Sequence, residues 1–478
     1  MSRSRARVLD DRACGVLLHP SSLRNHDPIG DIGPAAHEFV EWCADAGCRW
    51  WQMLPVGPVG AGDSPYASPS SFAGEPLLLS LDTLRDDGLL SAHELRESRR
   101  VAARAGGTRG DADPALARIA KEPALLAAFE AFRLGGGFDS ASFRAFGRRA
   151  SAWLPGWRAF TRDTLGYHAF VQFQFERQWS ALRACCRTRG VRLLGDLPIF
   201  VSLDSADVQS DPRLFRLNRM GRPQVVTGCP PDCFSRDGQR WGHPHYRWSA
   251  HARDGYRWWT SRIAHSLERF DALRIDHFVG FHHAYEIPAT ERTARRGAWR
   301  PQRGREVLAA ARAALGPLPL VAEDLGAVTP EVVALRRDFG LPGMQVLQHA
   351  FGCDNSSSLP HRHARESVVY TGTHDNDTSI GWANGLDSAT RRRFAAYAGA
   401  DAARDPAWAL SRLALSSPSA LAIIPMQDVL RLGSGARMNT PGTPKGNWRW
   451  RLPSRWRASA TRAGRQLRDL AAITGRIG

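Results

Sequence analysis

The chain has 478 residues, of which 43% are hydrophobic and 23% charged, a composition typical of a folded globular protein. Its formal net charge of +17 would suit nucleic acid or an anionic membrane surface. The arginines, however, are spread from Arg3 to Arg476 instead of being gathered in one segment, and no apolar run approaches the roughly 20 residues of a membrane span. We therefore expect neither nucleic acid nor a membrane as a partner.

The eight cysteines occur without a regular spacing, and the basic N-terminal residues are not followed by the apolar stretch of a secretory signal. Cys229, Cys233, His243 and His245 match no standard zinc spacing, so neither a metal nor a cofactor is expected. These features predict a reduced cytoplasmic protein. Its oligomeric state, monomer or homodimer, stays open.

Short apolar segments alternate with helical patterns along most of the chain. The predicted strands are 14–19, 48–56, 191–201, 270–276, 318–323, 343–351, 367–373 and 420–425. The predicted helices are 34–46, 167–189, 255–267, 303–315, 330–339, 388–398, 406–415 and 454–471. Alternating strands and helices predict a parallel sheet with covered faces, and eight such units predict an α/β fold closed into a (β/α)8 TIM barrel.

The connection between the second and third predicted strands is far longer than the others, since it runs from residue 57 to residue 190. It contains helical and loop segments of its own around 92–104 and 123–146. Connections of this length usually form subdomains, which at the C-terminal face of a barrel shape a substrate cleft. We predict one catalytic barrel domain over 1–478, with long insertions and notably an inserted subdomain at 57–165.

Three predicted strands end in acidic residues: ALRIDHF around Asp276, LVAEDLG around Glu323 and VVYTGTHDND around Asp375. A parallel barrel points the C-terminal ends of all its strands at one site, so these carboxylates should converge. Retaining cleavage of a glycosidic bond needs a carboxylate nucleophile and a carboxylic acid whose oxygens lie about 5 to 5.5 Å apart. Converging carboxylates therefore suggest glycosidic bond chemistry.

The neighbours of each carboxylate suggest its role. Arg274 lies two residues before Asp276, so both side chains point to the same side of a strand and the guanidinium keeps a nucleophile ionised. Apolar neighbours and nearby carboxylates should raise the pKa of Glu323, as a general acid and base requires. Asp375, in a polar turn after His374, suits binding of sugar hydroxyls in the transition state. Singly, each residue also fits an ion pair, a solvated strand end or an ordinary turn.

Specific motifs are distributed along nearly the whole chain. They are GVLLHPSSL from Gly15, SPYASPSSFAGEP from Ser64, LLGDLPIFVSLDSADV from Leu193, PPDCFSRDGQRWGHPHYRW from Pro230, RIDHFVGF from Arg274, AEDLG from Ala322, THDNDT from Thr373 and ARMNTPGTPKGNW from Ala436. With these motifs the chain resembles the 4-alpha-glucanotransferases, also called amylomaltases or disproportionating enzymes, which are relatives of the alpha-amylase group.

The resemblance implies retaining transfer of an α-1,4-glucan segment to the 4-hydroxyl of an acceptor glucan or glucose. It makes Asp276 the nucleophile, Glu323 the acid and base, and Asp375 the transition-state stabiliser. The substrate-binding residues would be Ser64, Tyr66, Asp196, Trp241, Arg274, His277, His374, Asn447 and Trp448. Aromatic faces would stack on sugar rings and exclude water, and loops 230–241 and 442–448 would form a lid over the acceptor.

The chain departs from the family pattern around the three carboxylates but not at them. The departures stand at Ala67, Glu75, Cys233, His243, Val279, His282 and His283. They concern subsite preference and leave the predicted chemistry intact. The alternatives are a retaining α-glucan hydrolase, a non-enzymatic carbohydrate-binding protein and, more distantly, an arginine-rich nucleic-acid binder.

Overall fold

The computed structural model describes residues 9, 11–107, 110–231, 235–354, 356–443 and 445–477. Eight parallel strands form one sheet in the order β10-β11-β12-β1-β2-β3-β6-β9. The strands are β1 Ala13–Leu17, β2 Trp50–Gln52, β3 Arg192–Pro198, β6 Ala272–Asp276, β9 Leu320–Ala322, β10 Gly343–Val346, β11 Ser367–Tyr370 and β12 Leu421–Pro425. Each lies on one of the eight predicted segments, and the predicted α/β barrel is confirmed.

The sheet closes almost completely on itself. Between β9 and β10, the two end strands, the N–H of Ala322 donates to the carbonyl of Pro342 at 2.9 Å. Nearby, the N–H of Met344 donates to Asp324 Oδ1 at 2.8 Å. Every residue of β1, β11 and β12 is buried, because helices cover the outer face of the parallel sheet while side chains fill its inside. This burial explains the continuous apolar runs in the sequence.

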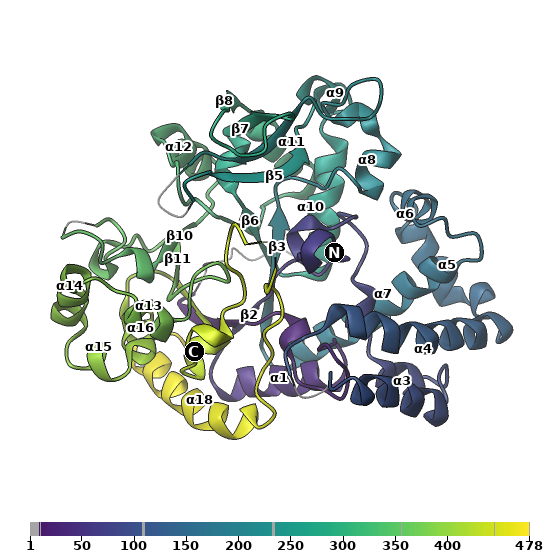
Figure 1. The fold of residues 1–478 in the computed structure, drawn as a ribbon, viewed down its shortest axis with the longest axis horizontal. Helices are drawn as coiled ribbons and strands as arrows, with labels where there is room; N and C mark the ends of the chain where they lie inside the picture. Colours follow the sequence, from purple (N-terminus) through teal and green to yellow (C-terminus); the bar gives the residue numbers. More distant parts are fainter. Residues whose placement is uncertain are drawn as a thin grey trace.

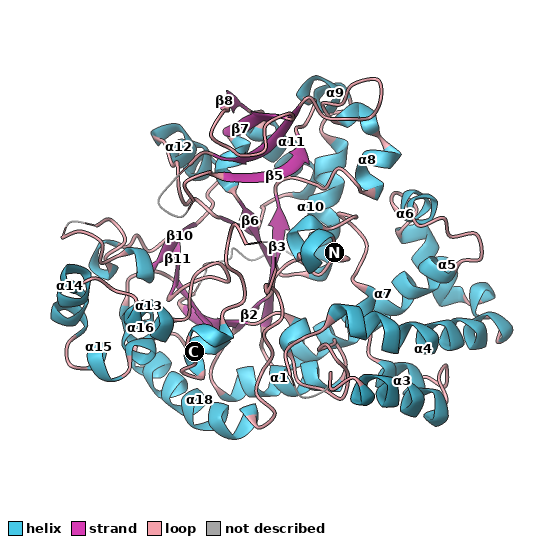
Figure 2. Ribbon diagram, viewed as in Figure 1, coloured by secondary structure: helices cyan, strands magenta, loops and turns pink. Residues whose placement is uncertain are grey.

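Helices surround the strands, as Figures 1 and 2 show. Those that match the predicted helices are α1 Pro34–Asp45, α7 Tyr167–Thr188, α10 Arg257–Arg269, α11 Gly304–Leu315, α12 Pro330–Asp338, α14 Ser388–Ala398, α16 Pro406–Ser416 and α18 Trp456–Ile473. Their ends differ from the predicted ones by no more than a few residues. Among the described residues, no helix combines the length and the apolar character that a bilayer span requires.

The long connection from β2 to β3 is mostly helical and lies on one side of the barrel (Figure 1). Before α7, its α-helices are α2 Leu81–Asp86, α3 Ala92–Arg104, α4 Pro114–Leu134, α5 Ala141–Arg149 and α6 Leu154–Phe160. The helical segment predicted from residue 123 actually begins at Pro114, where the Asp113 side chain accepts the N–H of Leu116 at 2.9 Å. Pro123 lies inside this helix, so it does not mark the helix start that a proline often indicates.

A second, antiparallel sheet was not predicted. Its order is β5-β4-β7-β8, with strands β4 Val225–Cys229, β5 Gln239–Pro244, β7 His283–Pro288 and β8 Ala298–Pro301. The strands come from two different connections, one after β3 and one after β6. The expectation that 230–241 is entirely a lid loop is wrong at its end, because Gln239 and Arg240 pair with β4. Residues 232–234 lie outside the described residues.

A buried lysine fastens the inserted helices to the barrel. Lys121 on α4 is fully buried, and its Nζ donates to the carbonyls of Leu77 at 2.8 Å and Leu79 at 2.7 Å. The same Nζ lies 3.7 Å from Asp27 Oδ2 and 4.0 Å from Asp31 Oδ2, in the loop that follows β1. The segment that carries Leu77 follows the SPY motif directly, so this contact anchors one border of the site described below.

Replacing Lys121 by Met should lower the free energy of unfolding by about 3–5 kcal/mol, because Asp31 and Asp27 lose a buried cation and only Asp27 keeps another, Arg99. Urea denaturation followed by circular dichroism measures the change. The matched control is Arg133→Ala on the same helix, which removes an exposed pair with Glu130. That change should cost no more than about 0.5 kcal/mol. Equal effects of the two substitutions would contradict the assigned role of Lys121.

Candidate active site

Adjacent strand ends bring four of the predicted residues to one edge of the barrel. Asp196 on β3 and Arg274 on β6 are register partners, and Asp276 is the last residue of β6. Glu323 follows the last residue of β9, the next strand in the sheet. Because neighbouring parallel strands end at the same edge, these side chains share one region of the C-terminal face, as predicted.

The Arg274 guanidinium joins two of the carboxylates. Its Nη1 donates to both carboxylate oxygens of Asp196, at 2.9 and 2.8 Å, and to Asp276 Oδ1 at 2.9 Å. The Arg274 side chain is only 4% exposed and that of Asp276 is 28% exposed. Burial alone would lower the pKa of Arg274, but the two carboxylates raise it well above its ordinary value. The guanidinium therefore stays charged and orients Asp276 toward solvent-accessible space.

Glu323 lies in surroundings that favour its protonated form. Burial raises the pKa of Glu323 well above its ordinary value, and the Asp276 carboxylate raises it further, whereas Arg274 opposes the shift. One oxygen, Oε2, accepts the backbone N–H of His277 at 2.6 Å. His277 has left-handed backbone angles, φ 53° and ψ 51°, which turn the chain back at the end of β6. The result is a carboxyl group whose protonated form is favoured, beside an ion-paired carboxylate.

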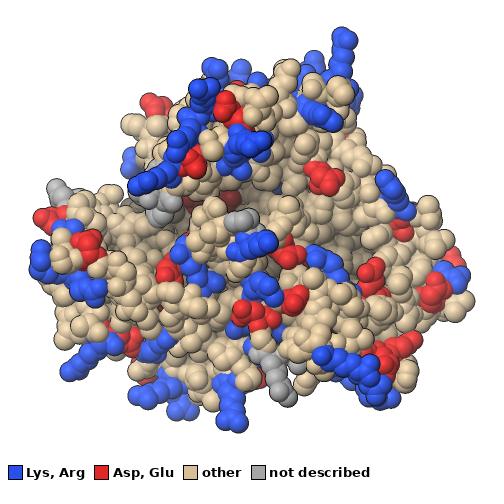
Figure 3. Space-filling model, viewed as in Figure 1, with Lys and Arg blue, Asp and Glu red and all other residues tan. Residues whose placement is uncertain are grey.

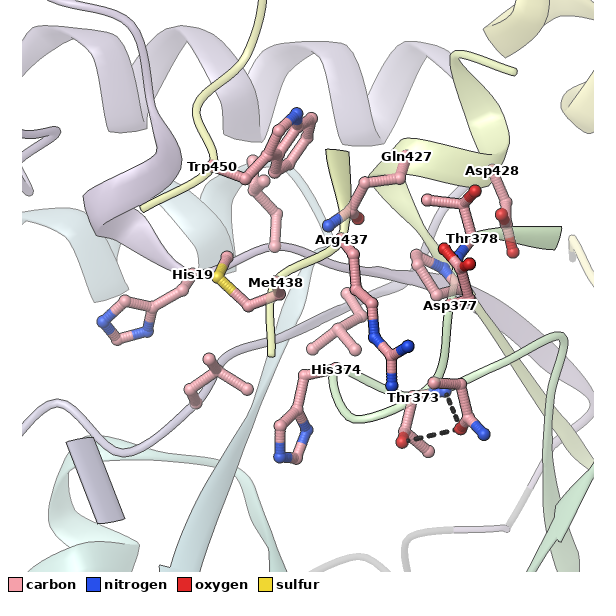
Figure 4. A pocket seen from close by; sticks show the side chains of 15 residues that line it. His19, Thr373, His374, Asp377, Thr378, Gln427, Asp428, Arg437, Met438 and Trp450 are labelled. Atoms are coloured by element: carbon pink, nitrogen blue, oxygen red, sulfur yellow. Dashed lines mark hydrogen bonds between the residues drawn. The ribbon is translucent and has the colours of Figure 1, made fainter. Parts of the chain in front are cut away.

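Asp375 is held by a loop that follows β11 and by a segment near the C-terminus. The N–H and hydroxyl of Thr373 both donate to Asn376 Oδ1 at 2.9 Å, which shapes the turn. Asn439 Nδ2 donates to Asp375 Oδ1 at 2.6 Å, and Arg437 Nη2 donates to the Asp375 carbonyl at 2.6 Å. Figure 4 shows Arg437 extending toward the loop that carries Thr373. The Asp375 side chain keeps 43% exposure, so it remains open to a ligand.

Tyr66 connects Asp375 with the other carboxylates. Its hydroxyl donates to Asp196 Oδ2 at 2.8 Å. Burial raises the pKa of Tyr66 well above its ordinary value, and Asp196, Asp276 and Asp375 raise it further while Arg274 opposes them. Asp196 shares Arg274 with Asp276, and the Tyr66 ring stacks on His374, whose Nε2 lies beside Asp375. Tyr66 therefore links the cluster around Asp276 to Asp375.

Aromatic rings line one side of this space. The rings of Tyr66 and His374 stack with centroids 5.1 Å apart and an interplanar angle of 14°. Trp448 lies 5.7 Å from Tyr66 and 5.9 Å from His374 by ring centroids. His374 Nε2 lies 3.3 Å from Asp375 Oδ1. These three predicted residues thus form an aromatic wall beside Asp375.

A second group of rings lies next to Asp276. Trp241 on β5 meets His277 edge to face at 4.8 Å, and Phe200 lies 6.3 Å from Trp241 and 6.4 Å from His277. Burial lowers the pKa of His277 to about 4, against the opposing effect of Asp276. His277 Nε2 is buried and has no hydrogen-bond partner among the described residues. A neutral imidazole with an unused nitrogen is suited to a sugar hydroxyl.

Two of the predicted substrate-binding residues, Ser64 and Asn447, form hydrogen bonds within their own loops. Ser64 Oγ accepts the N–H of Tyr66 at 3.2 Å. Asn447 Oδ1 accepts the N–H of Thr440 at 2.9 Å, and its Nδ2 donates to the Thr443 carbonyl at 2.9 Å. Their contacts therefore shape the loops that carry Tyr66 and Trp448. Within loop 442–448, residue 444 lies outside the described residues.

The departures from the family pattern fall into different surroundings. Glu75 is buried, and its oxygens accept the N–H groups of Val59 at 2.6 Å and Leu77 at 2.9 Å. Burial lowers the pKa of His243 to about 4, against the opposing effect of Asp276. Val279 is buried in the hydrophobic core. Cys233 lies outside the described residues.

Several residues of the site were not predicted individually: Phe200, Asn439 and Arg437. Phe200 falls within a predicted strand. An aromatic residue at the C-terminal end of a barrel strand is a signal that could have placed it at the site. Asn439 and Arg437 lie in the ARMNTPGTPKGNW motif, but a loop residue that reaches a partner more than 60 positions away leaves no local pattern. Among the described residues, no group of three or more His, Cys, Asp or Glu side chains is arranged to hold a metal ion.

The comparisons with known proteins agree with this geometry. A family model described as 4-alpha-glucanotransferase matches residues 18–162 and 156–457. A 4-alpha-glucanotransferase of Thermus thermophilus is 41% identical over 510 residues, which cover 98% of this chain and 99% of the relative. One from Synechocystis sp. is 40% identical over 484 residues, which cover 93% of this chain and 94% of the relative.

Solved structures give the same result. An amylomaltase from Streptococcus agalactiae, in complex with acarbose, superposes with a TM-score of 0.86 at 30% identity and covers 98% of this chain and 100% of its own. An amylomaltase from Corynebacterium glutamicum shares the fold, with a TM-score of 0.78 at 18% identity over 98% of this chain and 76% of its own. The chain belongs to the 4-alpha-glucanotransferase family.

Proposed function

We propose that the protein is a 4-alpha-glucanotransferase that moves an α-1,4-glucan segment from a donor to the 4-hydroxyl of an acceptor glucan or glucose. Its substrates are α-1,4-glucans and maltooligosaccharides, and it acts in the cytoplasm as a monomer or homodimer. The observation that carries the proposal is the pairing of Asp276, held by Arg274, with Glu323, whose pKa is raised by burial. Family membership supports the choice of an α-glucan as substrate.

In the first half-reaction, an Asp276 oxygen attacks the anomeric carbon while Glu323 gives its proton to the departing glycosidic oxygen. The donor segment is then held as an ester on Asp276, and the shortened glucan leaves. Asp375 binds hydroxyls of the same sugar ring, most tightly when the ring flattens toward an oxocarbenium ion. Glu323 is thus used in the protonated form that its buried surroundings favour.

In the second half-reaction, Glu323, now ionised, removes the proton from an acceptor 4-hydroxyl, and that oxygen displaces Asp276. Water in place of the sugar hydroxyl would give hydrolysis, so the outcome depends on how well the site is kept dry. The rings of Tyr66, Trp448 and Trp241 provide apolar surface on both sides of the carboxylates. We propose that a sugar stacked on these rings displaces water from the acceptor side.

Two further features are consistent with this proposal. We propose that residues 57–165 act as an inserted subdomain of a single catalytic domain over 1–478, since helices α2 to α6 interrupt the barrel there and Tyr66 belongs to the same connection. Figure 3 shows Lys and Arg side chains scattered over the visible face with Asp and Glu among them. That distribution favours a neutral glucan over nucleic acid as the ligand.

Incubation with maltotriose tests transfer directly. We expect glucose together with oligomers longer than maltotriose, because an acceptor sugar competes with water for the glycosyl ester. Chromatography of the products over time measures both. A mixture that contains only glucose and maltose would identify a hydrolase instead, and an unchanged substrate would identify a binding protein.

The Asp276→Asn variant should lose transfer and hydrolysis together, by at least about 1,000-fold in kcat, because the amide is a poor nucleophile and no ester forms. Initial rates with maltotriose measure the loss. Circular dichroism and thermal unfolding serve as controls for folding, since Arg274 retains its second partner, Asp196. Turnover near that of the unaltered protein would exclude Asp276 as the nucleophile.

The raised pKa of Glu323 predicts how kcat/KM falls at alkaline pH. The group is active as an acid only while protonated, so kcat/KM for maltotriose should fall about tenfold per pH unit above that pKa. A maltosyl fluoride donor expels fluoride, which needs no proton, so its kcat/KM should decline much less over the same range. An identical alkaline decline with both donors would contradict the assignment of Glu323.

A further inference from the structure

A second cavity lies against the small antiparallel sheet. Its volume is about 690 Å³, which is within the range of small-molecule sites. It is bordered by the chain before β4, by the residues that follow β5, and by β7 and β8. The residues that carry the argument are Trp248, Gln302, Arg216, Glu286 and Arg300. None of the residues assigned to the active site lines this cavity.

Two walls of the cavity are fixed by backbone contacts. Phe215 and Tyr246 form an isolated antiparallel bridge, and the N–H of Arg216 donates to the His245 carbonyl at 2.8 Å. The half-buried Trp248 ring packs 5.1 Å from Tyr246 by ring centroids. The cavity is therefore formed before any ligand arrives, which lowers the entropic cost of binding.

The polar groups of the cavity are held in place by one another. Glu286 accepts a hydrogen bond from Arg216, and Arg300 Nε lies 3.6 Å from its second oxygen. Gln302 Oε1 accepts from Trp248 Nε1 at 2.6 Å, while Gln302 Nε2 donates to the Arg300 carbonyl at 3.0 Å. An aromatic ring thus lies beside a fixed set of planar donors and acceptors.

This combination suits a neutral sugar. One face of a glucose ring carries C–H groups that an aromatic ring covers, and its hydroxyls need both donors and acceptors. An anion such as phosphate would need the arginines, but Glu286 lies between Arg216 and Arg300 and would repel it. The third arginine that lines the cavity, Arg247, donates to the carbonyls of Phe215 at 3.3 Å and Leu217 at 3.1 Å. The charged groups are therefore already engaged with one another or with backbone carbonyls, which leaves hydroxyl groups as the better partners.

We propose that this cavity is a second glucan-binding site that raises the affinity for long donor chains. The inference rests on the proposed function and extends it to the choice of substrate length. The Phe200 ring lies 6.3 Å from Trp241 at the active site and 6.1 Å from Tyr246 at the cavity wall, so the two sites share one packed unit. A chain held at the cavity raises the effective concentration of its other sugars at the carboxylates.

The test compares a long and a short substrate. For Trp248→Ala, the KM for amylose should rise about 3- to 10-fold, the amount expected for loss of one aromatic contact, with kcat unchanged. Transfer from maltotriose should stay unchanged, because a trisaccharide bound at the carboxylates does not also fill the cavity. Trp248→Phe keeps a ring and should restore most of the affinity for amylose.

Arg300→Ala provides a second route, because its side chain is 58% exposed and its loss does not threaten folding. Arg300→Ala should also raise the KM for amylose. The control is Arg296→Ala, in the connection between β7 and β8, where the arginine side chain is 82% exposed. This substitution should change neither the KM for amylose nor transfer from maltotriose. An unchanged KM for amylose in both Trp248→Ala and Arg300→Ala, or equal changes with both substrates, would overturn the proposal.

An anion site would give a different result. If inorganic phosphate, and not maltoheptaose, changes the tryptophan fluorescence of the unaltered protein but not of Trp248→Ala, the cavity binds anions and the proposal is wrong. The proposed function is tested separately. If the unaltered protein does not transfer glucose units from maltotriose, the proposed function is wrong, whatever the result at the cavity.

Discussion

The chemistry of the site depends on one buried guanidinium shared by two carboxylates. Arg274 meets Asp196 and Asp276 from adjacent parallel strands, and both contacts are 2.9 Å or shorter. A buried charge is costly unless it is paired, so the three groups stabilise one another and none is easily replaced alone. The arrangement orients Asp276, while burial raises the pKa of Glu323, which follows the neighbouring strand at the same edge of the sheet. The proposed nucleophile and the proposed acid are thus two similar side chains in different surroundings.

Much of the barrel and of this cluster was predictable because both follow from local sequence. Buried parallel strands are nearly continuous apolar runs, so all eight were recognised, and acidic residues at their ends were expected to converge. The spacing of Arg274 and Asp276 by two residues on a strand predicted their contact, which the structure contains. The apolar residues before Glu323 predicted a raised pKa, in agreement with its burial.

The parts that escaped prediction depend on contacts between distant segments. The strand Gln239–Pro244 has no alternating pattern and becomes a strand only by pairing with β4, so the second sheet was missed together with the cavity beside it. Asn439 and Arg437 reach Asp375 from a segment more than 60 residues later, which nothing in their immediate sequence indicates. The same holds for Lys121, whose burial depends on carbonyls more than 40 residues away.

The most direct measurement looks for the ester bond that we propose forms between Asp276 and the donor sugar. The Glu323→Gln variant lacks the base that releases the ester, whereas a maltotriosyl fluoride donor needs no acid to form it, so the intermediate should accumulate. Mass spectrometry of the quenched and digested protein should find a maltotriosyl group on the peptide that contains Asp276. A group attached to another carboxylate, or release of fluoride with no attached sugar at any time, would contradict the account.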